Sequence, residues 1–160
     1  MATTVQLKKV RNIETIALGF NYEASIDIEN DVDNTGIVDL QVNSAAVAGK
    51  IGKAAIIVDK QVPADNSGST DYTGYTVQMG DDGDDDGLIA AAQICAGHGS
   101  PVAEGTILVN TGDDVYLAPA IDDLEVTFTS AGDTDESLAL GGKVRVLVEY
   151  YPTAGDSYSG

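Results

Sequence analysis

Hydrophobic and polar residues alternate along several stretches of this chain, and this pattern predicts β-strands. In residues 22–29 every second residue is apolar, and residues 124–129 repeat the pattern. Residues 144–150 follow it as well, except that Leu147 makes the otherwise polar face partly apolar. A period of two places one face of a strand on a core and the other in water. These segments therefore predict half-buried strands.

Shorter apolar stretches add further strand candidates, separated by segments rich in Gly, Asp, Asn, Ser and Pro, which favour turns. Residues 89–95 fit a short helix or a buried strand equally well, because three alanines favour a helix. The remaining candidates are residues 37–42, 54–58, 75–79, 106–109 and 115–118. About eight short strands without a long amphipathic helix predict an all-β fold. We expect a β-sandwich, jelly-roll-like or immunoglobulin-like, with long acidic loops.

A chain of 160 residues is long enough for one self-sufficient domain. We assign residues 21–151 to the β-sandwich, residues 1–20 to an extended N-terminal arm, and residues 152–160 to a flexible C-terminal tail. The longest stretch without a pattern, residues 61–73, reads as an exposed loop.

Acidic residues dominate the charge of the chain. It has 26 Asp and Glu against 8 Lys and Arg, a net charge of −18, and between residues 61 and 142 it has sixteen acids and no Lys or Arg. Such a chain lacks the basic footprint that phosphate binding requires, so we expect no nucleic-acid partner. No purely apolar run exceeds five residues, so we expect no membrane span and synthesis as a soluble protein in a cytoplasm.

The first twenty residues differ from the rest because they carry three cations and a single acid, Glu14. This segment either folds onto its own acidic body or reaches a neighbouring subunit as an arm that adds a strand there. An arm could be removed, for example by deleting residues 2–12, without loss of the fold. The residues of the predicted arm are Val5, Leu7, Lys8, Lys9, Val10 and Arg11.

Residues 80–87 read Gly-Asp-Asp-Gly-Asp-Asp-Asp-Gly. Asp82, Asp84 and Asp86 have the alternate spacing with which calcium loops open, and repulsion between such carboxylates favours a divalent cation. Position twelve of an EF-hand would be Gln93 rather than a bidentate Glu, which excludes that motif. Two interpretations stay open, a solvated acidic loop and a Ca²⁺ site of another kind. The sequence predicts no other cofactor.

No catalytic constellation is present. Cys95 and His98 are the single cysteine and histidine, and their acidic surroundings do not favour a reactive thiolate. We therefore expect that the protein is not an enzyme. Tyr72 and Tyr75 lie near the acidic loop, which leaves a carbohydrate-binding surface module as an alternative.

Four segments together resemble small virion structural proteins of tailed bacteriophages. They are residues 77–90, with the acidic Gly-Asp loop, Gly105-Thr106, residues 124–132, and the glycine-led, Val-rich residues 138–150. The similarity is with capsid decoration (cement) proteins, particularly those of aquatic and cyanobacterial phages, and spans roughly residues 75–151.

The resemblance implies a β-rich, often trimeric protein on the outer capsid surface at local symmetry axes, without a catalytic set. Its partner would be the major capsid protein, on which the basic N-terminal arm and apolar strand edges would dock. It would bridge and stabilise the subunits of that protein. A tail, fibre or neck component of the same particle is the alternative that the resemblance leaves open.

Overall fold

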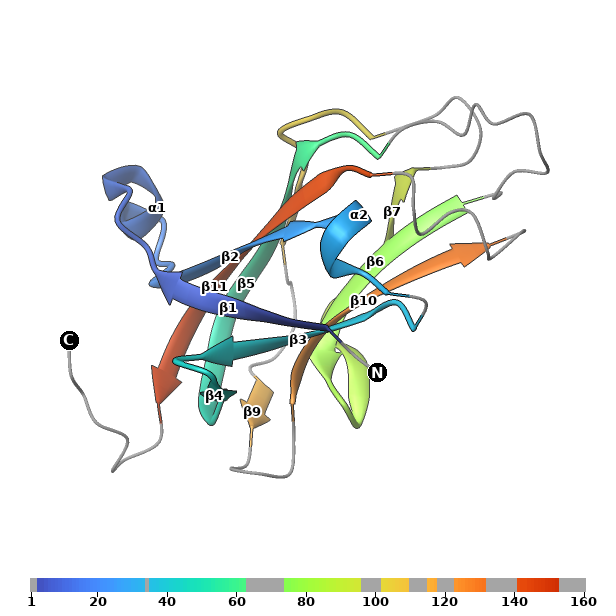
Figure 1. Ribbon diagram of the computed structural model, residues 1–160. Helices are drawn as coiled ribbons and strands as arrows, with labels where there is room; N and C mark the ends of the chain where they lie inside the picture. Colours follow the sequence, from blue (N-terminus) through green and yellow to red (C-terminus); the bar gives the residue numbers. More distant parts are fainter. Residues whose placement is uncertain are drawn as a thin grey trace.

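The computed structural model describes residues 3–33, 35–62, 74–95, 102–109, 115–117, 123–131 and 141–152 (Figure 1). At residues 74, 95, 116, 130 and 131 it describes the backbone alone.

The described residues form eleven strands and two short helices. The helices are α1 (Ile13–Ala17) and α2 (Ile28–Asp31). The strands are β1 (Thr3–Lys9), β2 (Tyr22–Asp27), β3 (Ile37–Val42), β4 (Ala45–Ala46), β5 (Gly49–Lys60), β6 (Gly74–Asp81), β7 (Asp84–Cys95), β8 (Ile107–Val109), β9 (Val115–Leu117), β10 (Leu124–Ala131) and β11 (Lys143–Pro152).

The strands form one mixed sheet in the order β7-β6-β10-β3-β1-β2-β11-β5-β8, with β4 paired to β3 and β9 paired to β5. The strand β1 joins its two halves. Residues 3–7 pair in parallel with residues 38–42 of β3, and Lys8 and Lys9 pair antiparallel with Glu23 and Tyr22 of β2. We call β7-β6-β10-β3 the acidic half, because these strands contain no Lys or Arg, and β2-β11-β5-β8 the basic half, because it contains five.

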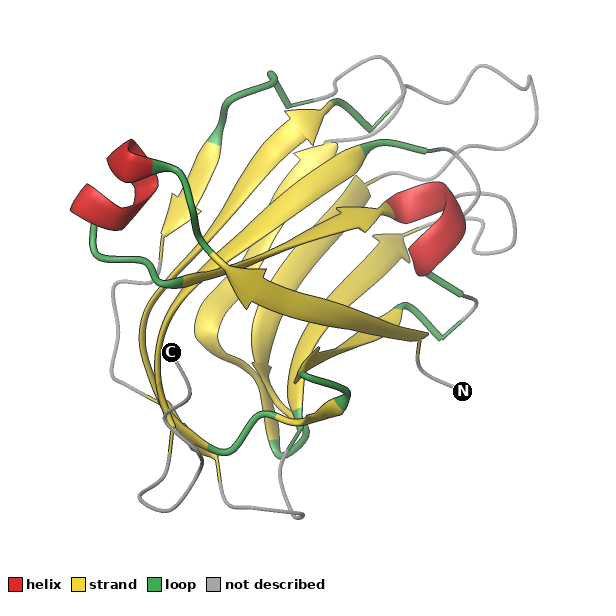
Figure 2. Cartoon of the chain, turned by 60° about the vertical axis from the view of Figure 1, so that its left-hand side comes forward, coloured by secondary structure: helices red, strands yellow, loops and turns green. Residues whose placement is uncertain are grey.

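The sheet curls over on itself, so the two halves face each other (Figures 1 and 2). At the far ends of the strand order, β7 approaches β5 and β8 without joining them in the ladder. The curled, barrel-like sheet confirms the prediction of an all-β protein. It has more strands than the eight expected.

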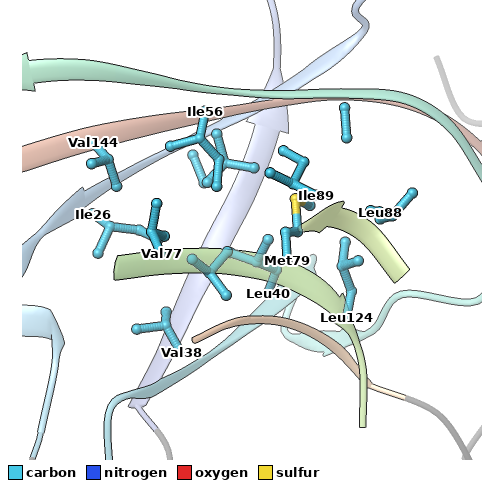
Figure 3. Packing of buried hydrophobic residues seen from close by; sticks show 14 of the residues in the cluster. Ile26, Val38, Leu40, Ile56, Val77, Met79, Leu88, Ile89, Leu124 and Val144 are labelled. Carbon is cyan, nitrogen blue, oxygen red and sulfur yellow. The ribbon is translucent and has the colours of Figure 1, made fainter. Parts of the chain in front are cut away.

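The inward faces of both halves enclose the core. Ile26, Ile56 and Val144 come from the basic half and meet Val77 and Met79 from the acidic half (Figure 3). All five side chains are fully or almost fully buried. The inward face of each strand is the apolar set that the alternation predicted, so hydrophobic burial fixes which face of each strand points inward.

Most predicted strands are found, with shifted bounds. The alternating stretch 22–29 ends as a strand at Asp27, because Ile28 begins α2 and is itself buried in the core. The two readings of residues 89–95 are resolved in favour of a strand, since these residues belong to β7. Residues 63–73 of the predicted loop and 153–160 of the predicted tail lie outside the described residues.

The predicted N-terminal arm does not project from the body. Residues 3–9 are β1, in the middle of the strand order, and Leu7 and Val10 are buried. The segment cannot project because β3 and β2 both form backbone hydrogen bonds with β1. Residues 3–9 therefore fold onto the body of the same chain rather than reach out as an arm.

Deleting residues 2–12 is therefore expected to abolish cooperative unfolding, because β3 and β2 would each lose a strand partner. As a milder form of the same test, Leu7→Ala should lower the free energy of unfolding by about 2–5 kcal/mol. The exposed Thr4→Ala on the same strand should change it by less than about 0.5 kcal/mol. Thermal melts followed by circular dichroism measure all three, and an intact melt after the deletion would contradict the placement of β1.

Candidate functional site

The two halves of the sheet differ sharply in charge. All eight Lys and Arg residues of the chain lie within residues 8–11, 50–60 and 143–145, at the end of β1 and on β5 and β11. The strands β3, β6, β7 and β10 contain no Lys or Arg. The acidic half therefore carries negative charge alone, whereas the strands of the basic half carry five cations and four acids. This asymmetry favours oriented binding to a partner.

On the acidic half, carboxylates crowd on the outward face. Asp39 of β3 and Glu125 of β10 are paired directly across the strands, while their neighbours Leu40 and Leu124 point into the core. The pKa of Asp39 is raised, first by burial and then by Asp123 and Asp82. The pKa of Glu125 is raised to about 7, first by burial and then by the charges of Asp39, Asp82, Asp123 and Asp85.

The acidic segment 80–87 is a hairpin with a bulge rather than an open loop. Asp81 pairs with Asp84 across the Asp82–Gly83 turn, and its Oδ1 accepts hydrogen bonds from the backbone N–H groups of Gly83 and Asp84, both at 2.8 Å. Residues 85–88 then lie opposite Gly80 alone, because Met79 already pairs with Ile89. A Cβ on Gly80 would lie 2.0 Å from the Asp84 carbonyl oxygen, so only glycine permits this bulge.

Of the three carboxylates of the predicted calcium loop, two lie together and Asp82 faces other acids. The exposed Asp84 lies beside Asp86, and their hydrogen bond is the first cause of its raised pKa. Asp82 instead acts on Asp39 and Glu125. Within the described ranges, no three His, Cys, Asp or Glu side chains are arranged to hold a metal ion. The calcium site stays a prediction.

The basic half carries a second apolar cluster on its outward face. Phe20, Ala55 and Leu147 are almost completely buried against one another, and Ile57 packs beside them. On the neighbouring edge strand, Ile107 pairs with Ile57 and Val109 with Ala55, so both share this face. Their side chains are 55% and 52% exposed. We call these six residues the outer apolar face.

The helix α1 connects β1 to β2 and projects beyond the ends of these strands, and its C-cap residue contacts Lys53 of β5 on this side (Figure 2). Its Ile13, Ile16 and Leu18 are 82%, 51% and 61% exposed. The position of α1 is fixed at both ends: Asn12 Oδ1 accepts from the Thr15 N–H at 3.1 Å, and Lys53 Nζ donates to the Leu18 carbonyl at 3.2 Å. Exposed apolar side chains on a fixed element mark an interaction surface.

A groove of ≈ 880 Å³ opens where β1 leaves β3. The strand β3 turns back into β4 through Asn43 and Ser44, both at positive φ, while β1 continues towards β2. Three exposed cations, Lys8, Lys9 and Arg11, belong to its lining. The rest of the lining consists of Leu7, Asn12, Tyr22, Glu23, Val42, Asn43, Ala45, Ala46, Tyr150 and Pro152.

The structure thus brings together the cations of the predicted arm but not all its apolar residues. Lys8, Lys9 and Arg11 share the groove, Leu7 and Val10 are buried, and Val5 is half-buried against the core.

Sequence reasoning missed the outer apolar face, although a signal was present. Leu147 breaks the alternation of its strand, and residues 54–58 are apolar without interruption. Both features place apolar side chains on two faces of a strand. Such a strand is either buried on both sides or binds a partner.

The tyrosines predicted as a sugar platform do not form one in the described chain. Tyr75 is fully buried, 6.1 Å from the Phe128 ring centroid, and burial raises the pKa of its hydroxyl. Tyr72 and His98 lie outside the described residues, as does the side chain of Cys95.

No family model matches the sequence, and no curated protein or solved structure is significantly similar to it. Neither helix in the described part of the chain has the length and apolar character that a membrane span requires.

The crowded carboxylates predict a pH-dependent stability. Because the pKa of Glu125 rises from an ordinary 4.5 to about 7 on folding, the folded state binds this proton more tightly than the unfolded state. The free energy of unfolding should therefore fall as the pH rises through this window. Glu125→Gln should raise it at about pH 8 by roughly 1 kcal/mol, after allowance for solvent screening, and raise the melting temperature by about 2–4 °C.

Near pH 4 the stabilisation by Glu125→Gln should vanish, because the wild-type carboxyl is then protonated. The exposed Glu104→Gln is the control and should have little effect at either pH. An equal effect of Glu125→Gln at both pH values would show that the charge of Glu125 is not the cause.

Proposed function

We propose that this protein is a structural component of a tailed-phage virion. It binds the outer surface of the capsid and stabilises the shell by bridging subunits of the major capsid protein. It acts by binding and has no enzymatic activity. The observation that carries the proposal is the outer apolar face with the exposed apolar side chains of α1 beside it. The resemblance to capsid decoration proteins supplies the kind of partner.

The outer apolar face supports docking on a large, fixed partner. Ile107 and Val109 lie on β8, which ends the strand order, so an apolar surface and a strand edge coincide. Natural proteins usually protect such edges with charges or short strands, and this one is short but apolar. Burial of an exposed isoleucine contributes about 1.5–3 kcal/mol, and a shell repeats such a contact many times.

The distribution of charge supports one orientation on the shell. The basic half faces the capsid, with Lys53 and Arg145 flanking the apolar residues. Lys53 contacts the Leu18 carbonyl, and Arg145 forms a 3.2 Å ion pair with Asp59. The acidic half faces solvent, where its negative charge keeps particles apart.

Two finer features belong to the same proposal. We infer a homotrimer at local symmetry axes, as the resemblance implies, and we interpret the curled sheet as a jelly-roll-like sandwich whose layers are the acidic and basic halves. The shared strand β1 supports this interpretation, since strands that switch between sheets form the corners of orthogonal sandwiches.

A tail, fibre or neck component would use the same kind of apolar face. The number of copies per particle distinguishes such a component from a decoration protein. A decoration protein is present in hundreds of copies spread over the shell, whereas a tail or neck component is present in a handful at one vertex. Electron microscopy of the native particle gives both the number and the position.

The test of docking is binding to expanded, undecorated shells of the same phage. Ile107→Asp should weaken binding about 30-fold, because it replaces a buried apolar contact worth roughly 2 kcal/mol. Wild-type protein should also raise the temperature at which shells disrupt. Cosedimentation measures the affinity, and light scattering follows disruption.

Thr129→Asp is the matched control, since it adds the same charge at an exposed strand position of the acidic half. It should leave shell binding unchanged. Equal binding by the Ile107→Asp variant, or no binding of the wild type to any shell, would overturn the proposal.

A further inference from the structure

We propose that the groove between β1 and β4 binds an extended, acidic polypeptide segment of a partner protein. This inference does not rest on the outer apolar face and would hold for any larger assembly to which the protein belongs. It rests on the charge of the groove and on the exposed turn into β4 among its lining residues.

The charge of the groove is opposite to that of the protein as a whole. Lys8, Lys9 and Arg11 line it, and Glu23 is the acid among its lining residues. The chain as a whole carries a net charge of −18, whereas three of its eight cations line this one groove. Concave walls of one sign focus the field and concentrate a ligand of opposite charge.

The turn from β3 into β4 forms another part of the lining and leaves room for the main chain of a ligand. Within the described part of the chain β4 pairs with β3 alone, through Gln41–Ala46 and Val42–Ala45. Ala45 and Ala46 are exposed and their methyl side chains obstruct little. The strand β3 separates β4 from β1, since Gln41 and Val42 pair with both, so the free edge of β4 faces away from the cations. An extended segment can instead lie over the exposed residues 43–46, where its carboxylates reach Lys8, Lys9 and Arg11.

The position of β4 is fixed before any ligand arrives. The Gln6 Oε1 accepts the Ser44 N–H at 2.8 Å, and the Gln6 Nε2 donates to the Gln41 Oε1 at 3.3 Å. On the other side, the Tyr150 hydroxyl donates to the Ala48 carbonyl at 2.8 Å. A preorganised wall lowers the entropy that binding must overcome.

The same charges fit a polypeptide better than a nucleic acid. Three cations match a few carboxylates spaced along an extended chain. A nucleic acid would bring a phosphate every few ångströms against Glu23 and the surrounding acidic surface. The ligand class is therefore a short segment that carries several Asp or Glu residues and is flexible enough to extend.

The experiment uses the full-length protein and a fluorescent synthetic peptide with the sequence of residues 80–87, which carries five Asp. Fluorescence anisotropy should show binding that weakens as the salt concentration rises. A peptide with all five Asp replaced by Asn should not bind. On binding of the acidic peptide, amide exchange at Ala45 and Ala46 should slow, which distinguishes binding in the groove from diffuse attraction.

Lys8→Glu with Arg11→Glu should weaken binding of the peptide about tenfold or more. Because Lys8 lies opposite Glu23 in the ladder, Arg11→Glu alone, outside the strands, should give a smaller loss without risk to the fold. The control is Lys60→Glu with Lys143→Glu, a pair on the β5–β11 ladder outside the groove that changes the net charge equally. It should bind like the wild type.

Equal binding of the Asn peptide, equal loss in the control pair, or no binding at low salt would each overturn the proposal. So would tighter binding of a single-stranded oligonucleotide or of inorganic phosphate than of the acidic peptide. None of these results depends on shells, so a failure here is distinct from a failure of the proposed docking on a capsid.

Discussion

The double pairing of β1 is the constraint on which the rest of the structure depends. One seven-residue strand supplies a parallel partner to β3 and an antiparallel partner to β2, and so joins the acidic half to the basic half. The side chains of Leu7 and Val10 bury the junction. The groove arises from the same geometry, because β3 turns away at Asn43 while β1 continues. The fold and the candidate binding groove therefore have a single origin.

The parts of the fold that follow from local alternation could be predicted from the sequence. Residues 37–42 are β3 with the predicted bounds, and residues 124–129 and 144–150 lie within β10 and β11. The acidic start of β7 could not be predicted, because Asp and Gly disfavour strands and only the bulge around Gly80 accommodates them there. The place of β1 could not be predicted either. Its pairing with β3 depends on contacts distant in sequence. The positive charge of the segment fits a strand of the body and a projecting arm equally well.

The candidate surfaces show the same division. The sequence identified Lys8, Lys9 and Arg11 as a group but not the groove that holds them, since the other wall comes from residues 42–46. It identified the acidic run but not its neighbours Asp39 and Glu125, which the ladder brings beside it. Carboxylates crowd there because Leu40 and Leu124, on the opposite face of the same strands, are fixed in the core. Apolar burial thus holds like charges together against their repulsion.

The place of β11 has a consequence for the timing of synthesis. This strand contains residues 143–152, yet it lies between β2 and β5 in the interior of the strand order. Its Leu147 completes the cluster with Phe20 and Ala55. A nascent chain on the ribosome lacks this strand, so β2 and β5 each lack one of their partners and the outer apolar face is incomplete. The outer apolar face is therefore complete only after translation has passed β11.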